Sequence, residues 1–298
     1  MNTRAGYVVM LVAMGLGWGA TQPMGKIAVS TGHKEFGLIF WQLIVGAVLL
    51  GAILIVQRRV VPLTKATLGF AVIIALIGTI IPNSTFYYSV AHLPSGIMSI
   101  LISTVPLMAF PVAMALGMDR FSTGRLVGIL CGLAGVALIA LPGSSLPDAG
   151  MAAYLPIAMI GPLFYAFEGN YVAKFGTAGM DAVQAMFLAS VVGALIMAPV
   201  AVGSGQWIDP VAPWGRAEWA LVLGSAVHTM CYCAYVWLAG RAGAVFAAQC
   251  GYIVTGTGVI WAMLILGERF SPWVWAALCV MMVGLFLVQP RERAVNAA

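Results

Sequence analysis

The sequence reads Asp119-Arg120-Phe121-Ser122 in its first half and Glu268-Arg269-Phe270-Ser271 in its second half. The two stretches lie 149 residues apart, which is half of the 298-residue chain. The same offset, without gaps, aligns Gly135 with Gly284. Because self-similarity at a long fixed period is typical of a duplicated unit, the sequence predicts an internal repeat.

Composition indicates that the repeated units lie in a lipid bilayer. Hydrophobic residues make up 62% of the chain and charged residues only 8%, whereas soluble domains carry roughly 25% charged residues. This imbalance excludes an ordinary soluble enzyme. Basic residues outnumber acidic ones by 14 to 9, and with so few charges this excess is attributed to membrane topology, so no nucleic-acid partner is expected.

Apolar runs separated by short polar breaks recur along the whole chain. Each is close to the roughly 20 residues that a helix needs to cross a bilayer. The ten runs cover residues 7–30, 36–56, 67–90, 95–118, 124–141, 151–173, 182–203, 217–239, 244–266 and 271–288. Few residues remain for connections, so no separate soluble domain is expected.

The basic residues are distributed unequally between the two ends of the predicted spans. Ten spans place both termini on one side, together with Arg4, Arg58, Arg59, Lys65, Arg120, Arg125, Lys174, Arg241, Arg291 and Arg293. The opposite side carries Lys26, Lys34, Arg216 and Arg269. Because Lys and Arg are enriched in cytoplasmic loops, both termini are predicted to be cytoplasmic.

Each half of the chain holds five predicted spans, so the second half enters the bilayer in the opposite orientation to the first. The expected fold class is an all-α membrane protein of ten transmembrane helices, built from two inverted five-helix repeats at residues 1–145 and 146–298. Inverted repeats are typical of secondary transporters, in which a site near the midplane is exposed alternately to either side.

Short motifs resemble a known family of transporters. They are Gly17-Trp18-Gly19, Leu93-Pro94-Ser95 and the acidic-Arg pairs at 119–120 and 268–269. The chain resembles the EamA branch of the drug/metabolite transporter superfamily over nearly its whole length, and within it is most similar to bacterial YddG-type aromatic amino acid exporters. The resemblance implies ten helices, an inner-membrane location, and export of aromatic and other hydrophobic amino acids. Asp119 stands where the family usually has Glu.

Helix-breaking residues at mid-depth are candidates for the translocation path, because irregular backbone within a membrane is tolerated only in protein or beside a cavity. The candidates for helix breaks or gating are Pro23, Pro106, Pro111, Gly161, Pro162, Gly256 and Gly258. The alternative is that Pro and Gly are simply common in membrane helices.

Polar and aromatic side chains recur at helical spacing and are candidates for a substrate cavity. In the eighth span His228, Cys231, Tyr232 and Tyr235 share one stripe. Further candidates pair at i,i+4 or i,i+3: Trp18 with Gln22, Asn83 with Tyr87, Ser99 with Ser103, and Gln249 with Tyr252. The alternative is packing between helices, since Ser, Asn and Gln commonly bridge them.

Glu168 is the carboxylate that lies well inside a predicted span, with Tyr165 one turn earlier on the same face. A charge buried at that depth costs about 2.5–3.5 kcal/mol on insertion scales, which marks a candidate for binding a substrate amine or for proton coupling. Pairing with Lys174, or reaching the interface, is the structural alternative.

Other function classes lack their signatures. No G-x-S-x-G or H-E-x-x-H motif points to an enzyme, and no repeated ring-forming segment points to a channel filter. Cys231-x-Cys233 has neither the spacing nor the partners of a metal site, so no metal and no cofactor is expected. An exporter of lipophilic cationic drugs or other small metabolites remains the alternative, because aromatic cavities with one acid also suit such cations.

A small-residue face raises the question of oligomeric state. Gly128 and Gly132 stand four residues apart in the fifth span, a spacing that allows two helices to approach closely. Such faces pack helices within one bundle or between two chains. The sequence is therefore compatible with a monomer or a homodimer.

Overall fold

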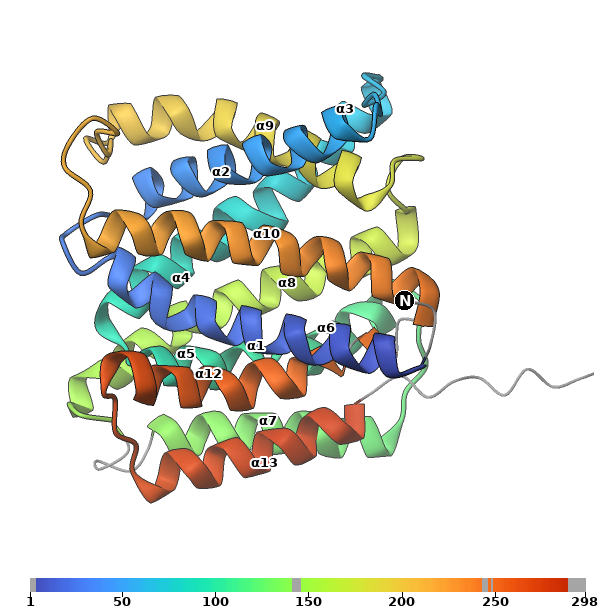
Figure 1. Cartoon of the computed structure of the whole chain (residues 1–298). Helices are drawn as coiled ribbons and strands as arrows, with labels where there is room; N and C mark the ends of the chain where they lie inside the picture. The colour runs from blue at the N-terminus through green and yellow to red at the C-terminus, as the bar shows by residue number, and fades with distance from the viewer. Residues whose placement is uncertain (1–3, 141–145, 243–245, 248, 289–298) are drawn as a thin grey trace, which may run out of the picture.

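The computed structural model describes residues 4–140, 146–242, 246–247 and 249–288, and its described elements are all helices (Figure 1). They are α1 (Arg4–Ala28), α2 (Glu35–Val56), α3 (Lys65–Ile74), the π-helix η1 (Ala75–Ile80), α4 (Ile81–His92), α5 (Ser95–Ile102), α6 (Val105–Ala115), α7 (Thr123–Ala140), the 3₁₀-helix η2 (Ala149–Tyr154), α8 (Leu155–Phe175), α9 (Ala182–Gly203), α10 (Arg216–Ala242), α12 (Cys250–Leu266) and α13 (Pro272–Val288).

The helices form the ten predicted spans. Seven of the described helical segments are long and apolar enough to cross a membrane. Three of these segments each consist of consecutive elements, namely α3, η1 and α4, then α5 and α6, and finally η2 and α8. The shorter apolar helices α12 and α13 add two. The tenth is α1, which has 25 residues and packs against α10 and α12. The predicted all-helical, ten-span fold is confirmed.

Helix packing follows the internal repeat. Helix α1 packs against α10 and α12, and its counterpart in the second half, α8, packs against α4 and α6. Helices α2 and α9 pack together, as do α5 and α12, and α7 and α13. The first span of one half corresponds to the first span of the other, and so on for all five. When each helix is replaced by its counterpart, the same set of contacts results, as expected for two inverted repeats.

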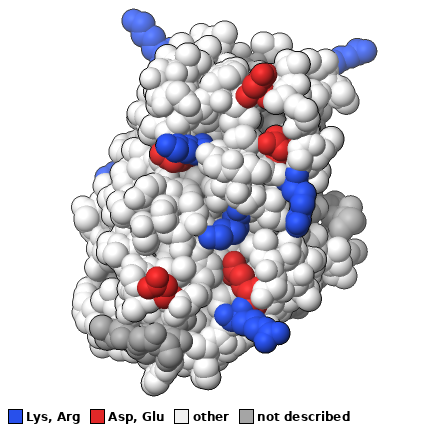
Figure 2. Space-filling model, turned by 90° about the vertical axis from the view of Figure 1, so that its left-hand side faces the viewer, with Lys and Arg blue, Asp and Glu red and all other residues white. Residues whose placement is uncertain are grey.

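The connections gather at two opposite ends of the bundle. At one end, where Figure 1 marks the N-terminus, Arg59 pairs with Asp181 and Lys174 donates a hydrogen bond to the Leu116 carbonyl. At the other end the His33 imidazole contacts the Glu218 carboxylate at 2.6 Å. Figure 2 shows this second end, where the charged side chains are scattered among uncharged ones. Within the described ranges, the structure therefore separates the two groups of basic residues that the sequence distinguishes; Arg291 and Arg293 lie outside the described residues.

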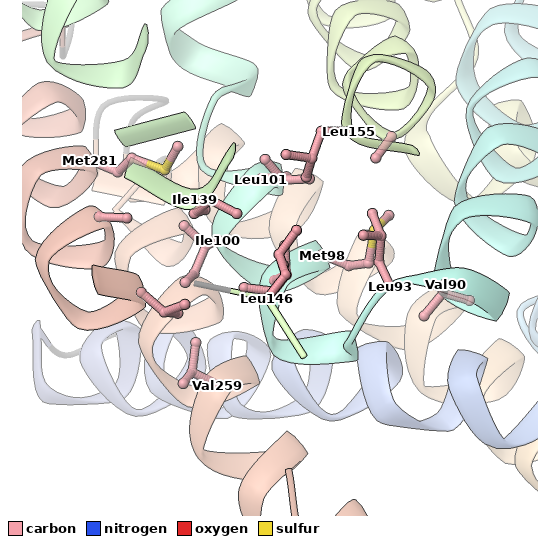
Figure 3. Close-up of a cluster of buried hydrophobic side chains, with 14 residues drawn as sticks. Val90, Leu93, Met98, Ile100, Leu101, Ile139, Leu146, Leu155, Val259 and Met281 are labelled. Carbon is pink, nitrogen blue, oxygen red and sulfur yellow. The ribbon is translucent and has the colours of Figure 1, made fainter. Parts of the chain in front are cut away.

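The largest apolar cluster surrounds α5 (Figure 3). Residues 95–101 of this helix are all buried. Leu93, Ile97 and Ile100 have no exposed surface, and Ile139 of α7, Leu155 of α8 and Met281 of α13 pack with them. Helix α5 is therefore enclosed by elements from both halves, which ties the two repeats into one body.

Glycines bring α7 and α13 into backbone contact. A Cβ atom on Gly128 would lie 2.8 Å from the Gly284 carbonyl oxygen, and a Cβ on Gly284 would lie 2.7 Å from the Gly128 carbonyl oxygen. A Cβ on Gly132 would overlap the Leu107 side chain. The Gly128-x-x-x-Gly132 face is thus used within the chain, as small-residue faces are in many membrane bundles.

Most of the candidate helix breaks lie inside continuous helices. Pro23, Pro111 and Pro162 are internal to α1, α6 and α8, and Gly161, Gly256 and Gly258 are internal to α8 and α12. Membrane helices tolerate such residues because neighbouring groups and local adjustments satisfy the freed backbone. An interruption is seen at 103–104, directly before α6, whose second residue is Pro106.

A π-helix that the apolar pattern does not predict interrupts the third span. The Ile81 N–H donates to the Leu76 carbonyl, five residues earlier. Pro82 follows at once and cannot donate to the Gly78 carbonyl, since proline lacks an N–H and its ring clashes with the carbonyl four residues before it. A wider turn relieves that clash, so Pro82 is the sequence signal that was missed. Such turns occur frequently at functional sites.

The repeated acidic-Arg motif has a structural role at the end opposite the N-terminus. The Glu268 carboxylate accepts hydrogen bonds from the Ser95 N–H (2.8 Å), the Ser95 hydroxyl (3.0 Å) and the Gly96 N–H (3.0 Å), at the first turn of α5. Lys26 of α1 donates to the Leu93 carbonyl just before that turn, at 3.1 Å. We name Glu268, Ser95 and Gly96 the Glu268 clamp. Its counterpart carboxylate, Asp119, pairs with Arg125.

The Glu268→Ala substitution is expected to destabilise the folded protein. It removes three charge-assisted hydrogen bonds and leaves two N–H groups at the α5 start without this acceptor, at a cost of about 2–4 kcal/mol. Thermal unfolding of the purified protein checks this, with the exposed neighbour Arg269→Ala as the matched control. Equal melting temperatures for the two variants would contradict the stabilising role of the clamp.

Candidate functional site

An aromatic cluster joins α1 to α10. The Trp18 ring centre lies 5.8 Å from that of Tyr235, 6.1 Å from that of His228 and 6.4 Å from that of Tyr232. The rings are tilted or edge-on to Trp18, which is a favourable arrangement for aromatic pairs. We name Trp18, His228, Tyr232 and Tyr235 the aromatic cluster. The α10 stripe therefore faces a candidate residue of a different span.

The Trp18 indole nitrogen is buried and has no hydrogen-bond partner among the described residues. Buried polar atoms are normally satisfied, so this donor is available to another group. Cys231, the remaining member of the stripe, lies against Gly17, where a Cβ atom would approach its sulfur to 2.8 Å. The thiol is therefore a packing contact between α1 and α10.

A second group of side chains surrounds Glu168 on α8. The Glu168 side chain is 8% exposed, and the Tyr232 hydroxyl lies within hydrogen-bonding reach of its carboxylate. The Tyr165 hydroxyl donates to the Asn83 amide oxygen of α4 at 3.0 Å. We name Glu168, Tyr165 and Asn83 the carboxylate cluster. Because Tyr232 touches both groups, the aromatic and carboxylate clusters form one continuous site.

The π-helix forms one wall of this site. A Cβ atom on Gly78 would lie 2.6 Å from the Glu168 carboxyl carbon. Only glycine at position 78 leaves room for the carboxylate where it lies now. The widened turn of η1 and its glycine together position the acidic group.

Lys174 does not neutralise Glu168. Its ammonium group donates to the Leu116 carbonyl at 3.1 Å and lies over the Phe175 ring. Within the part of the chain that the structure describes, no Lys, Arg or His nitrogen lies within 4 Å of the Glu168 carboxylate. The Glu168 side chain is 8% exposed, and the alternative of pairing with Lys174 is not seen among the described residues.

A further buried polar contact lies on α4 and α2. The Tyr87 hydroxyl donates to the Gln42 amide oxygen at 2.9 Å. Tyr87 is a candidate from the sequence, whereas Gln42 is not among the predicted residues, although it is the one amide in an otherwise apolar span and so carries a sequence signal. Gly78 carries none, because its role depends on a contact with α8.

The other candidate residues lie outside these clusters. The Ser99 hydroxyl donates to the Ser95 carbonyl and the Ser103 hydroxyl to the Ile100 carbonyl, so both are satisfied within α5. Gln22 lies half-buried one turn beyond Trp18, and Gln249 is exposed before α12. The Tyr252 hydroxyl is buried without a described partner. Among the described residues, no group of three or more His, Cys, Asp or Glu is placed to hold a metal ion.

Two inverted five-helix halves around a buried polar and aromatic site define a membrane transporter rather than an enzyme. The EamA-like transporter family matches residues 5–141 and again residues 153–289. The chain therefore belongs to the EamA-like transporter family, with one repeat in each half.

One curated protein agrees with this assignment, and one solved structure has a similar fold. An "Uncharacterized transporter sll0355" of Synechocystis sp. is 22% identical over 263 residues, which cover 80% of this chain and 76% of that protein. One protein of known crystal structure superimposes with a TM-score of 0.64 at 15% identity, over 96% of both chains. At that identity the second likeness supports the fold alone.

Proposed function

We propose that this chain exports amino acids, aromatic and other hydrophobic ones, by alternating access through a central path at the aromatic and carboxylate clusters. The observation that carries the proposal is the contact of Trp18 with three aromatic rings of α10, next to a buried carboxylate. Aromatic surfaces suit an aromatic side chain, and a carboxylate suits the ammonium group of an amino acid. This is the specificity expected of a YddG-type exporter.

The proposed orientation in the membrane rests on the distribution of charge. Arg58, Arg59 and Lys65 lie in or next to the α2–α3 connection, at the end of the bundle that carries the N-terminus. Because basic residues favour the cytoplasmic side, that end faces the cytoplasm in the proposed orientation, in a bacterial inner membrane. The repeats of this transporter are residues 1–145 and 146–298.

Efflux from liposomes tests the proposed function. Purified protein is reconstituted in liposomes loaded with radiolabelled phenylalanine, tryptophan, tyrosine or leucine, and efflux is followed with and without a pH gradient. Efflux of the aromatic amino acids that protein-free liposomes do not show supports the proposal. If no amino acid leaves and a lipophilic cation such as tetraphenylphosphonium does, the protein is the alternative cation exporter, which the uncompensated Glu168 also favours.

The Trp18→Ala substitution is expected to lower phenylalanine efflux about tenfold, because loss of one aromatic contact removes roughly 1–1.5 kcal/mol of ring packing. Trp18→Phe retains a ring and should lose less. Trp214→Ala, which removes an exposed tryptophan of the α9–α10 connection, is the matched control. An equal loss of efflux in the Trp214 variant would contradict a specific role for Trp18.

A further inference from the structure

Glu168 is a buried carboxylate that lacks a counterion in the described part of the chain. An isolated ionised carboxylate at low exposure is costly unless it is paired or protonated. The groups that approach it are a tyrosine hydroxyl and the close backbone of Gly78. One hydroxyl donor does not neutralise a full negative charge. The Glu168 carboxylate therefore needs one positive charge that the described residues do not supply.

The titratable groups around Glu168 are identifiable on every helix that packs against α8. Helix α4 contributes Tyr87, and α8 itself contributes Tyr165. The packed elements α5, α6 and η1 contain no titratable side chain, and Tyr154 of η2 stacks on His92 of α4. From α10 comes Tyr232, with His228 one turn before it. Since tyrosine hydroxyls are neutral near pH 7, Glu168 and His228 are the acid–base groups of this region that remain to be distinguished.

The contacts also separate Glu168 from the imidazole. His228 contacts Trp18, whereas Glu168 contacts Gly78 and lies within hydrogen-bonding reach of Tyr232. A ligand seated across Tyr232 would meet aromatic rings with one end and the carboxylate with the other. This polarity matches a molecule that carries an apolar ring and a cationic group.

We propose that Glu168 is a single-cation site, occupied by a proton when the transporter is empty and by the ammonium group of the substrate when it is loaded. This inference rests on the proposed transport function but extends it to lipophilic amines, since the site recognises the ammonium group and not the carboxylate. The exchange is balanced: the carboxylic acid of Glu168 gives its proton to water, and the substrate ammonium keeps its three protons and pairs with the carboxylate. One proton is released for each cation bound.

Proton release on ligand binding tests this exchange in the purified full-length protein. Three probes share one ring: phenylalanine, phenethylamine, which lacks the carboxylate, and 3-phenylpropionate, which lacks the ammonium group. In weakly buffered solution at a pH where Glu168 is protonated, phenylalanine and phenethylamine are expected to release about one proton for each molecule bound. The propionate is expected to release none. Infrared difference spectra should show loss of a protonated carboxylic acid band on addition of either amine.

Variants assign the proton to one residue. Glu168→Gln is expected to abolish proton release and the infrared signal, and to weaken phenethylamine binding at least about tenfold. Glu168→Asp, which keeps a carboxylate, should retain release. Asp209→Asn, at an exposed acid of the α9–α10 connection, is the matched control and should behave as the natural protein does. Circular dichroism and gel filtration verify that each variant is folded.

The outcomes separate this inference from the proposed function. Phenethylamine-driven proton release that depends on Glu168, without any amino acid efflux, would keep the cation site and overturn amino acid export. Phenylalanine efflux with no proton release, or with release that persists in Glu168→Gln, would keep export and overturn the cation site. Release that disappears only in His228→Gln would assign the exchange to the imidazole and overturn the proposal.

Discussion

The Gly128→Val substitution is expected to lower the melting temperature of the purified protein by roughly 10 °C, through a loss of about 3 kcal/mol or more in the free energy of unfolding. Gly128 and Gly284 bring the backbones of α7 and α13 together, and even a single Cβ at position 128 would lie 2.8 Å from the Gly284 carbonyl oxygen. The obstacle is backbone, which cannot rotate aside. The two helices must therefore separate, and their apolar contact is lost.

The same helix supplies the control for this prediction. Gly124 opens the first turn of α7, where a Cβ atom would meet nothing closer than the Ser122 hydroxyl at 4.0 Å. Gly124→Ala is therefore expected to keep the melting temperature within about 2 °C of the natural protein, since alanine favours helix. The melting temperatures of both variants are measured by thermal unfolding that is monitored by size-exclusion chromatography. A Gly128→Val protein as stable as the control would show that α7 and α13 do not need this close approach.

The Gly78→Ala substitution is expected to lower binding and efflux of the amine substrate at least about tenfold while leaving the protein folded. A Cβ at position 78 would meet the end of the Glu168 side chain and not backbone. The carboxylate can therefore rotate away at small cost to the fold, but it then leaves the reach of Tyr232. Gly78 is a positioning residue, and its substitution should act through Glu168.

Three readouts distinguish positioning from general damage. Gly78→Ala should change the infrared band of the Glu168 carboxylic acid and shift the pH dependence of amine binding, with the melting temperature nearly unchanged. Gly69→Ala on the same span is the control, because no atom lies within 4 Å of a Cβ there. A loss of efflux in Gly78→Ala that comes with an unchanged infrared band and pH dependence would refute the positioning role.

The fold was predictable because it depends on properties that are local in sequence. Ten apolar runs of bilayer length require ten helices, since a backbone in lipid must satisfy its own hydrogen bonds. The offset between Asp119-Arg120 and Glu268-Arg269 then gives the duplication, and five spans per half give the inversion. None of these steps needs knowledge of which helices touch.

The site was only partly predictable because it depends on which helices touch. Periodicity placed His228, Tyr232 and Tyr235 on one stripe, and that stripe does face Trp18. Ser99 and Ser103 have the same spacing as Trp18 and Gln22, yet their hydroxyls are satisfied by their own helix. Spacing alone does not distinguish a face toward the site from a face toward a neighbour.

The pairs α2–α9 and α7–α13 have a consequence for the switch between the two end states of transport. In each pair a helix contacts its own counterpart in the other half. If the two halves exchange conformations, these contacts therefore stay the same. The contact of α1 with α10, by contrast, is replaced by that of α8 with α4. In the proposed alternating-access cycle these two pairs, at opposite edges of the bundle in Figure 1, and the pair α5–α12 would keep the same contacts in both end states. Identical changes in both halves shift both end states equally. In the proposed cycle the resting orientation would therefore depend on positions where the halves differ, as Glu268 differs from Asp119.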